Sequence, residues 1–243
     1  MVTFTVSARG KPIDMPMPIF LNRSYYEVLG KIDSIFGFMR FSHFYGGRSF
    51  ISQQISRQDL FWMYDNNIGL RLPLSNHNFD YKVYRSELQF FRDFHRAGNI
   101  IICANDSLAN AIRTDFPLFK IEASVINCIT TQDDITNSLV LYDSIILPMS
   151  YSSSPELLVN LTPKDRIVLF GNAGCAYNCP NKLCYKYISD SIFFGKASGY
   201  NCSQSINIRP KLGFIEFDLD RLIAIGYSRF KLLRKIPTGT TGY

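Results

Sequence analysis

Four of the six cysteines in this chain of 243 residues gather near its carboxyl end. They are Cys175, Cys179, Cys184 and Cys202, separated by three, four and seventeen residues. Thiolates grouped in this way suit an iron-sulfur cluster or a soft metal ion, because each needs about four ligands that converge on one point. Structural zinc usually takes cysteine pairs two to four residues apart, which the first three meet loosely. Free cysteines are also often buried as small apolar side chains. The segment therefore predicts an iron-sulfur or zinc site, with buried thiols as the alternative.

The composition predicts a folded cytoplasmic protein. Apolar residues make up 47% of the chain and charged residues 19%, enough to bury a sizeable core. No apolar run approaches the roughly 18 residues of a membrane-spanning helix, and the amino terminus lacks the order of a secretory signal. In a reducing compartment, cysteines are more often thiols or metal ligands than disulfides.

Short apolar segments alternate with segments of helical periodicity along almost the whole chain. Alternating strands and helices indicate βαβ units and a mainly parallel sheet. Eight strands in about 240 residues fit a closed (β/α)8 TIM-barrel-like fold, an α/β architecture, better than an open sheet. The eight predicted strands are Thr3–Ser7, Phe38–Phe44, Ile68–Leu72, Asn99–Cys103, Phe119–Val125, Ser144–Leu147, Arg166–Phe170 and Arg229–Leu232.

The chain shows no linker or repeat, so residues 1–235 are predicted to form a single barrel-like domain. The cysteine-rich segment 171–210 interrupts the rhythm and forms the connection after the seventh strand, with a weakly helical stretch at 183–194. Long connections are usually functional. Residues 236–243 are predicted to be a flexible tail.

Polar side chains near the predicted strand ends are the candidates for binding substrate, since barrel active sites gather there. Glu122 lies inside a strand, where a carboxylate needs either a pocket or an ion-pair partner. His43 and His77 read as ordinary hydrogen-bonding histidines. No HExxH or GxSxG motif occurs, so no catalytic residue is identified and the chain can be an enzyme or a binding protein. The substrate-binding candidates are Arg48, Arg71, Asn76, Asn105, Glu122 and Lys231.

The net charge of +6 permits an RNA partner as well as a small-molecule substrate. The basic residues are mostly dispersed, which is more typical of a solvated surface. A partner protein and an oligomer are further alternatives that the sequence permits.

Three segments carry a resemblance to a known family. Residues 44–76 run from FYGGRSF through a helix to a strand that ends in Asn. Residues 171–180, GNAGCAYNCP, follow a late strand, and residues 214–235 contain a closing helix, a Gly and a Phe-Lys strand. In this order they resemble the collagenase-like peptidase family U32, whose superfamily includes RNA and ubiquinone hydroxylation proteins.

The resemblance implies a barrel-like fold and, as in the hydroxylation proteins, a four-iron four-sulfur (4Fe-4S) cluster held by four cysteines. Cys175 and Cys179 match the cysteine segment, and Cys184 and Cys202 correspond to downstream thiols. The expected function is an iron-sulfur enzyme or accessory in hydroxylation of RNA or of a small aromatic substrate. The alternative is a zinc-stabilised RNA-binding or assembly module without catalysis.

Overall fold

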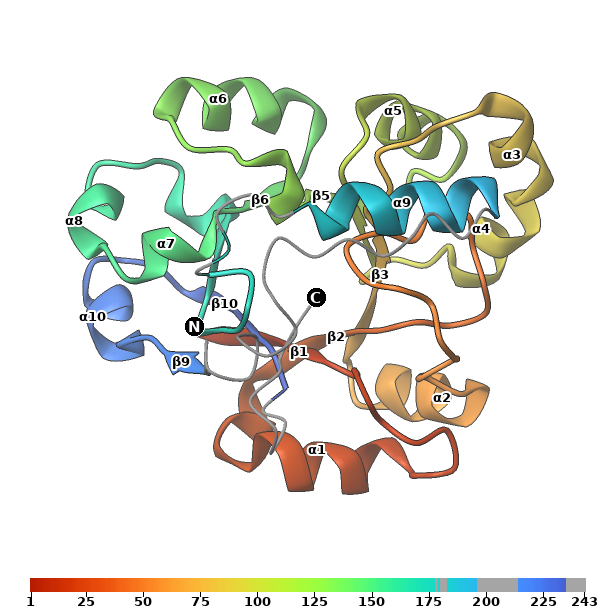
Figure 1. Cartoon of the computed structure of the whole chain (residues 1–243). Helices are drawn as coiled ribbons and strands as arrows, with labels where there is room; N and C mark the ends of the chain where they lie inside the picture. Colours follow the sequence, from red (N-terminus) through yellow and green to blue (C-terminus); the bar gives the residue numbers. More distant parts are fainter. Residues whose placement is uncertain (178, 180–182, 196–213, 235–243) are drawn as a thin grey trace.

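The computed structural model describes residues 1–177, 179, 183–195 and 214–234. Eight parallel strands close into a barrel in the order β1-β10-β7-β6-β5-β4-β3-β2, with the helices around it (Figure 1). The predicted (β/α)8 fold is therefore confirmed. The barrel strands are β1 (Thr3–Ser7), β2 (Ile32–Phe36), β3 (Gly69–Leu74), β4 (Ile100–Cys103), β5 (Lys120–Ala123), β6 (Ser144–Ile146), β7 (Ile167–Phe170) and β10 (Arg229–Leu232).

The helices lie in the connections, as a barrel of βαβ units requires. Two two-residue strands, β8 (Asn172–Ala173) and β9 (Ile215–Glu216), pair antiparallel outside the barrel. None of the helices in the described part of the chain has the length and apolar character needed to cross a bilayer. The α-helices are α1 (Met17–Tyr25), α2 (Arg57–Asp65), α3 (Tyr81–Ser86), α4 (Leu88–Phe94), α5 (Asp106–Asp115), α6 (Gln132–Leu141), α7 (Met149–Ser152), α8 (Pro155–Leu158), α9 (Cys184–Phe194) and α10 (Leu219–Ala224); the 3-10 helices are η1 (Tyr26–Lys31), η2 (Val125–Asn127) and η3 (Lys164–Arg166).

Seven of the eight predicted strands overlap a barrel strand. The prediction of the second strand is wrong. The chain enters the barrel earlier, as β2, and the predicted strand Phe38–Phe44 is a loop. Phe38 and Phe44 are buried all the same, because this loop packs against the core. The side chain of Gln54 accepts the Phe38 N–H at 3.2 Å, so the loop backbone is paired without a strand neighbour. The apolar pattern at residues 38–44 reflects burial of the side chains and not pairing with a neighbouring strand.

Helix α9 spans the predicted helical stretch at 183–194 and lies across one end of the barrel in Figure 1. It contacts the loop after β3, where the Asn76 side-chain amide donates to the Ser189 carbonyl at 2.9 Å. The Asn78 amide likewise donates to the Asp190 carboxylate at 2.9 Å. The helix that begins at Cys184 is therefore fixed over the carboxyl ends of the strands. The predicted boundary at 235, the tail 236–243 and part of the segment 171–210 lie outside the described residues.

Candidate active site at the barrel mouth

A buried ion pair occupies the interior of the barrel. One terminal nitrogen of Arg71 on β3 lies 2.5 Å from Glu122 Oε2 on β5, and neither side chain is more than 1% exposed. Glu122 also lies 3.9 Å from the guanidinium of Arg229 on β10. Since β5 is hydrogen-bonded only to β4 and β6, contacts with β3 and β10 must cross the interior. Of the two roles open to Glu122, the structure therefore places it in an ion pair.

Hydroxyl groups complete this interior cluster. Ser34 on β2 accepts the Arg71 Nε–H at 2.8 Å, and Ser144 on β6 donates to Glu122 Oε2 at 3.0 Å. Glu122 Oε1 is buried and has no hydrogen-bond partner among the described residues. Burial raises the pKa of Glu122, but the charges of Arg71, Lys231 and Arg229 outweigh it and hold the pKa below its ordinary value. The carboxylate is therefore ionised inside the barrel.

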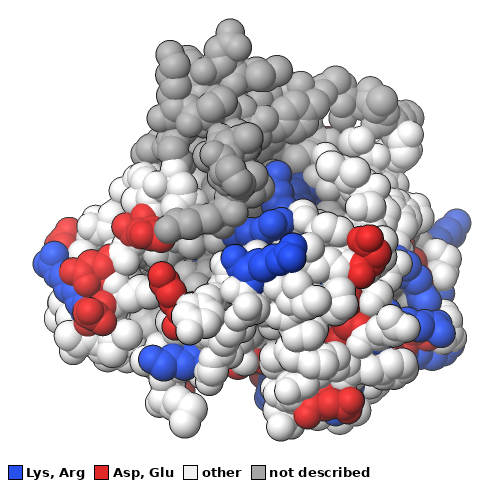
Figure 2. Space-filling view, turned by 90° about the horizontal axis from the view of Figure 1, so that it is seen from below, with Lys and Arg blue, Asp and Glu red and all other residues white. Residues whose placement is uncertain are grey.

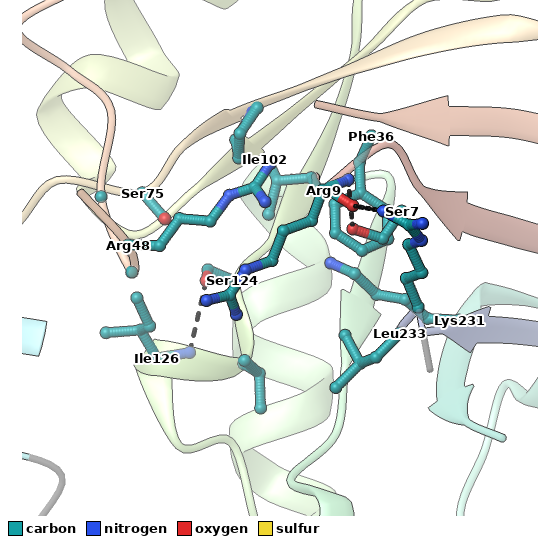
Figure 3. A pocket seen from close by; sticks show the side chains of 15 residues that line it. Ser7, Arg9, Phe36, Arg48, Ser75, Ile102, Ser124, Ile126, Lys231 and Leu233 are labelled. Atoms are coloured by element: carbon teal, nitrogen blue, oxygen red, sulfur yellow. Dashed lines mark hydrogen bonds between the residues drawn. The ribbon is translucent and has the colours of Figure 1, made fainter. Parts of the chain in front are cut away.

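Above the ion pair, a pocket opens among the carboxyl ends of the strands (Figure 3). Its cavity volume is about 40 Å³. Four of its lining residues are cationic, and none of the described lining residues is acidic. Among the described lining residues, the ionisable side chains are therefore all basic. The lining consists of Ser7, Arg9, Phe36, Gly46, Gly47, Arg48, Pro73, Ser75, Ile102, Ser124, Val125, Ile126, Lys231, Leu233 and Arg234.

Two of the pocket arginines are held in place by contacts behind them. The Arg48 guanidinium donates to Gln54 Oε1 at 2.7 Å and lies 4.3 Å from the centre of the Phe38 ring. The Arg234 guanidinium donates to the Gly10 carbonyl at 2.8 Å and lies 5.0 Å from the centre of the Phe20 ring. Guanidinium groups fixed in this way lose little side-chain entropy when they bind an anion.

Lys231 lies in the pocket wall on β10 and is 4% exposed. Its ammonium nitrogen is 4.3 Å from the centre of the Phe36 ring and 5.8 Å from that of Phe170. Within the described chain it has no hydrogen bond or ion pair. Burial lowers the pKa of Lys231 to about 7, against the opposing charge of Glu122 and with the help of the charges of Arg71 and Arg48.

Asn76 and Asn105 form hydrogen bonds within loops and helices and do not line the pocket. The buried Asn76 amide donates to the carbonyls of His43 and Tyr45, both at 3.0 Å, as well as to α9. Asn105 caps α5, because its side-chain oxygen accepts the Leu108 N–H at 3.1 Å. Neither residue lines the pocket described above.

His43 and His77 also lie apart from the pocket. His43 Nδ1 lies 2.7 Å from Glu87 Oε1, in the break between α3 and α4. Burial lowers the pKa of His77, although the charge of Asp190 opposes the shift. Both lie outside the lining of the pocket.

Sequence reasoning missed Arg9 and Arg234 as pocket residues. Each follows a barrel strand by two residues, Arg9 after β1 and Arg234 after β10. The rule that found Lys231 therefore applies to both. Figure 2 also shows adjacent Lys and Arg side chains gathered near the middle of one face of the molecule. The basic residues are thus less evenly dispersed than the sequence suggests.

Three of the four predicted metal ligands, Cys175, Cys179 and Cys184, are half-buried, and Cys202 lies outside the described residues. Burial, and then the nearby thiols of Cys184, Cys175, Cys179 and Cys128, raise the pKa of Tyr185 well above its ordinary value. The neighbourhood of the Tyr185 ring therefore includes Cys128 as well as the three described ligand candidates. Within the described ranges, no three His, Cys, Asp or Glu side chains form a ready-made metal site.

The fold is similar to that of a solved structure, the U32 peptidase Mk0906. The TM-score is 0.64 over 96% of this chain and 92% of that chain, and the sequences are 12% identical, so the likeness is one of fold. No protein-family model matches the chain, and no curated protein matches it in sequence. The barrel implied by the resemblance is confirmed: across nearly its whole length, the chain has the fold of a U32 peptidase.

Proposed function

We propose that this chain is a distant member of the U32 peptidase family whose barrel mouth binds an anionic substrate. The observation that carries this proposal is the lining of the pocket, which combines Arg9, Arg48, Lys231 and Arg234 with no described acidic residue. Guanidinium groups bind carboxylate and phosphate through paired, charge-assisted hydrogen bonds. The carboxyl ends of the strands are also where barrel enzymes hold their substrates.

Two serines add hydrogen-bond donors to the same pocket. Ser7 Oγ accepts the Arg9 N–H at 3.2 Å, and Ser124 Oγ accepts the Ile126 N–H at 3.3 Å (Figure 3). A hydroxyl oxygen that accepts a hydrogen bond still has its own proton to donate. An anion in the pocket would therefore meet hydroxyl donors as well as cations.

Replacing Arg48 by Ala is expected to weaken the binding of inorganic phosphate about 10- to 100-fold, the usual worth of a hydrogen bond to a charged group. Isothermal titration calorimetry of the full chain measures this change. Arg113→Ala is the control, because it removes the same charge from a residue that pairs with Asp143, away from the pocket. Equal weakening by both variants, or none by Arg48→Ala, contradicts the proposed site.

We also propose that the chain acts in hydroxylation, of RNA or of a small aromatic substrate, with an iron-sulfur cluster held by Cys175, Cys179, Cys184 and Cys202. The grouping of the first three thiols around Tyr185 supports this ligand set, together with the resemblance to the hydroxylation proteins. A bound cluster supplies electron transfer. The chain's own contribution would be to hold the anionic substrate at the barrel mouth and to fix α9 through Asn76.

The metal proposal predicts that protein purified without oxygen contains iron and sulfide, and that Cys179→Ser loses both. Such a cluster is held by four cysteine thiolates, and the variant removes one of them. Absorption spectra and metal analysis measure this, and Cys103→Ala is the control, since Cys103 is buried on β4. Stoichiometric zinc would support the zinc-stabilised RNA-binding or assembly module instead. Metal retained in Cys179→Ser, or a metal-free wild type that folds normally, contradicts the ligand set.

A further inference from the structure

Lys231 differs from the other cations of the pocket. Arg48 and Arg234 are held by acceptors of the protein, whereas the Lys231 amine has no hydrogen bond or ion pair among the described residues and faces the rings of Phe36 and Phe170. A buried lysine elsewhere in the chain shows the contrast. The Lys11 amine donates a hydrogen bond to the Asp59 carboxylate at 2.8 Å, so it already has a partner within the protein.

We propose that Lys231 forms a Schiff base with a small carbonyl compound that carries a carboxylate or a phosphate group. The inference rests on the anion-binding function proposed above and adds to it the class of substrate. In this arrangement Arg48 and the neighbouring arginines hold the anionic group, while the carbonyl carbon reaches the Lys231 nitrogen. Figure 3 shows the Arg48, Arg9 and Lys231 side chains extending into the same pocket.

The step conserves atoms and electrons without an added reagent. The lone pair of the neutral Lys231 amine attacks the carbonyl carbon, which forms the C–N bond and moves the carbonyl π electrons to oxygen. The resulting carbinolamine loses its oxygen as water, taking up one proton from the nitrogen and one from solvent, and leaves a protonated imine. Neither the substrate nor the protein is oxidised or reduced.

The surroundings of Lys231 favour the neutral amine that this attack needs. Arg71 from β3 and Arg48 from the loop after β2 repel its positive charge, while Glu122 from β5 attracts it. Arg9 and Arg234 line the same pocket, and the faces toward β2 and β7 present the aromatic rings. With a pKa of about 7, a large share of the amine is neutral at physiological pH. An ordinary lysine is almost fully protonated there.

Reductive trapping tests the inference. The full chain is incubated with pyruvate or with dihydroxyacetone phosphate, treated with sodium borohydride, and mapped by peptide mass spectrometry. We expect the reduced adduct on Lys231, at least about tenfold above the yield with uncharged hydroxyacetone, because that compound lacks the anionic group. The two anionic probes separate a carboxylate from a phosphate preference. Trapping should rise as the pH is raised through about 7.

The same maps contain the controls. Buried, ion-paired Lys11 and exposed Lys120 report modification that does not depend on the pocket. Lys231→Arg should remove the adduct, and circular dichroism confirms that the variant keeps its fold. Phosphate binding that responds to Arg48→Ala with no adduct on Lys231 overturns this inference and leaves the anion site standing. An equal yield with hydroxyacetone overturns the anionic substrate class. Failure of both phosphate binding and trapping overturns the proposed function as well.

Discussion

Replacing Glu122 by Ala is expected to cost about 3–5 kcal/mol of the free energy of unfolding, because it leaves a charged guanidinium uncompensated inside the barrel. Arg71 is 1% exposed, and its terminal nitrogen lies 2.5 Å from Glu122 Oε2. Ser144 loses its acceptor in the same variant. Because neither side chain of the pair is more than 1% exposed, solvent does not replace the lost carboxylate. A loss of this size is a large share of the stability of an ordinary domain.

Urea unfolding monitored by circular dichroism measures the effect. The double variant Arg71→Leu with Glu122→Leu removes both charges and should be much less destabilised than the sum of the two single variants. Glu156→Ala is the control for loss of one carboxylate, since Glu156 is exposed and its removal should change stability by no more than about 0.5 kcal/mol. A loss below about 1 kcal/mol for Glu122→Ala would contradict a buried ion pair.

The ion pair also makes the free energy of unfolding depend on pH. Because the pKa of Glu122 in the folded protein is below its ordinary value of 4.5, its contribution is complete above that value. The contribution is lost as the pH falls through the lowered pKa, when the folded state must bind the proton. The difference in stability between wild type and Glu122→Ala should therefore shrink in acid. Unfolding curves recorded from neutral pH downward test this.

The second large effect is expected for Gly46→Ala, at about 3 kcal/mol of destabilisation, because the added methyl group has no room. A Cβ on Gly46 would lie 2.3 Å from the Ser75 carbonyl oxygen and 2.6 Å from the Asn76 nitrogen. Both are backbone atoms, which cannot rotate away as a side chain can. Gly46 and Ser75 line the pocket, so any adjustment would also displace Arg48 two residues later.

We therefore expect Gly46→Ala to weaken phosphate binding in addition to lowering the midpoint of urea unfolding. Gly30→Ala is the matched control, since a Cβ at Gly30 meets nothing within 4 Å. That variant should be neutral or slightly stabilising, because it restricts the unfolded chain. If the two variants were similarly stable, the loop at Gly46 would move easily to make room for the methyl group. That result would contradict the close approach of Gly46 to the Ser75 backbone.

The architecture of the protein can be predicted from its amino-acid sequence. Alternating apolar and helical segments predicted a closed barrel, and seven predicted strands overlap strands of the barrel. This succeeded because strands of a parallel barrel are buried and therefore appear as short apolar runs. The same signal failed at Phe38–Phe44, where a loop is buried against the core and its backbone bonds to side chains. Apolar patterning reports burial, and burial is not specific to strands.

The roles of the polar residues depend on contacts that form only in the tertiary structure. Sequence position made Arg71, Glu122 and Lys231 equivalent candidates at strand ends. Closure of the barrel turns Arg71 and Glu122 toward each other in the interior, while Lys231 reaches the pocket without an ionic partner in the described chain. Closure also brings Arg9, just after the first strand, beside Arg234, just after the last. The physical reason is that charge compensation depends on distances across the barrel, which join residues far apart in the chain.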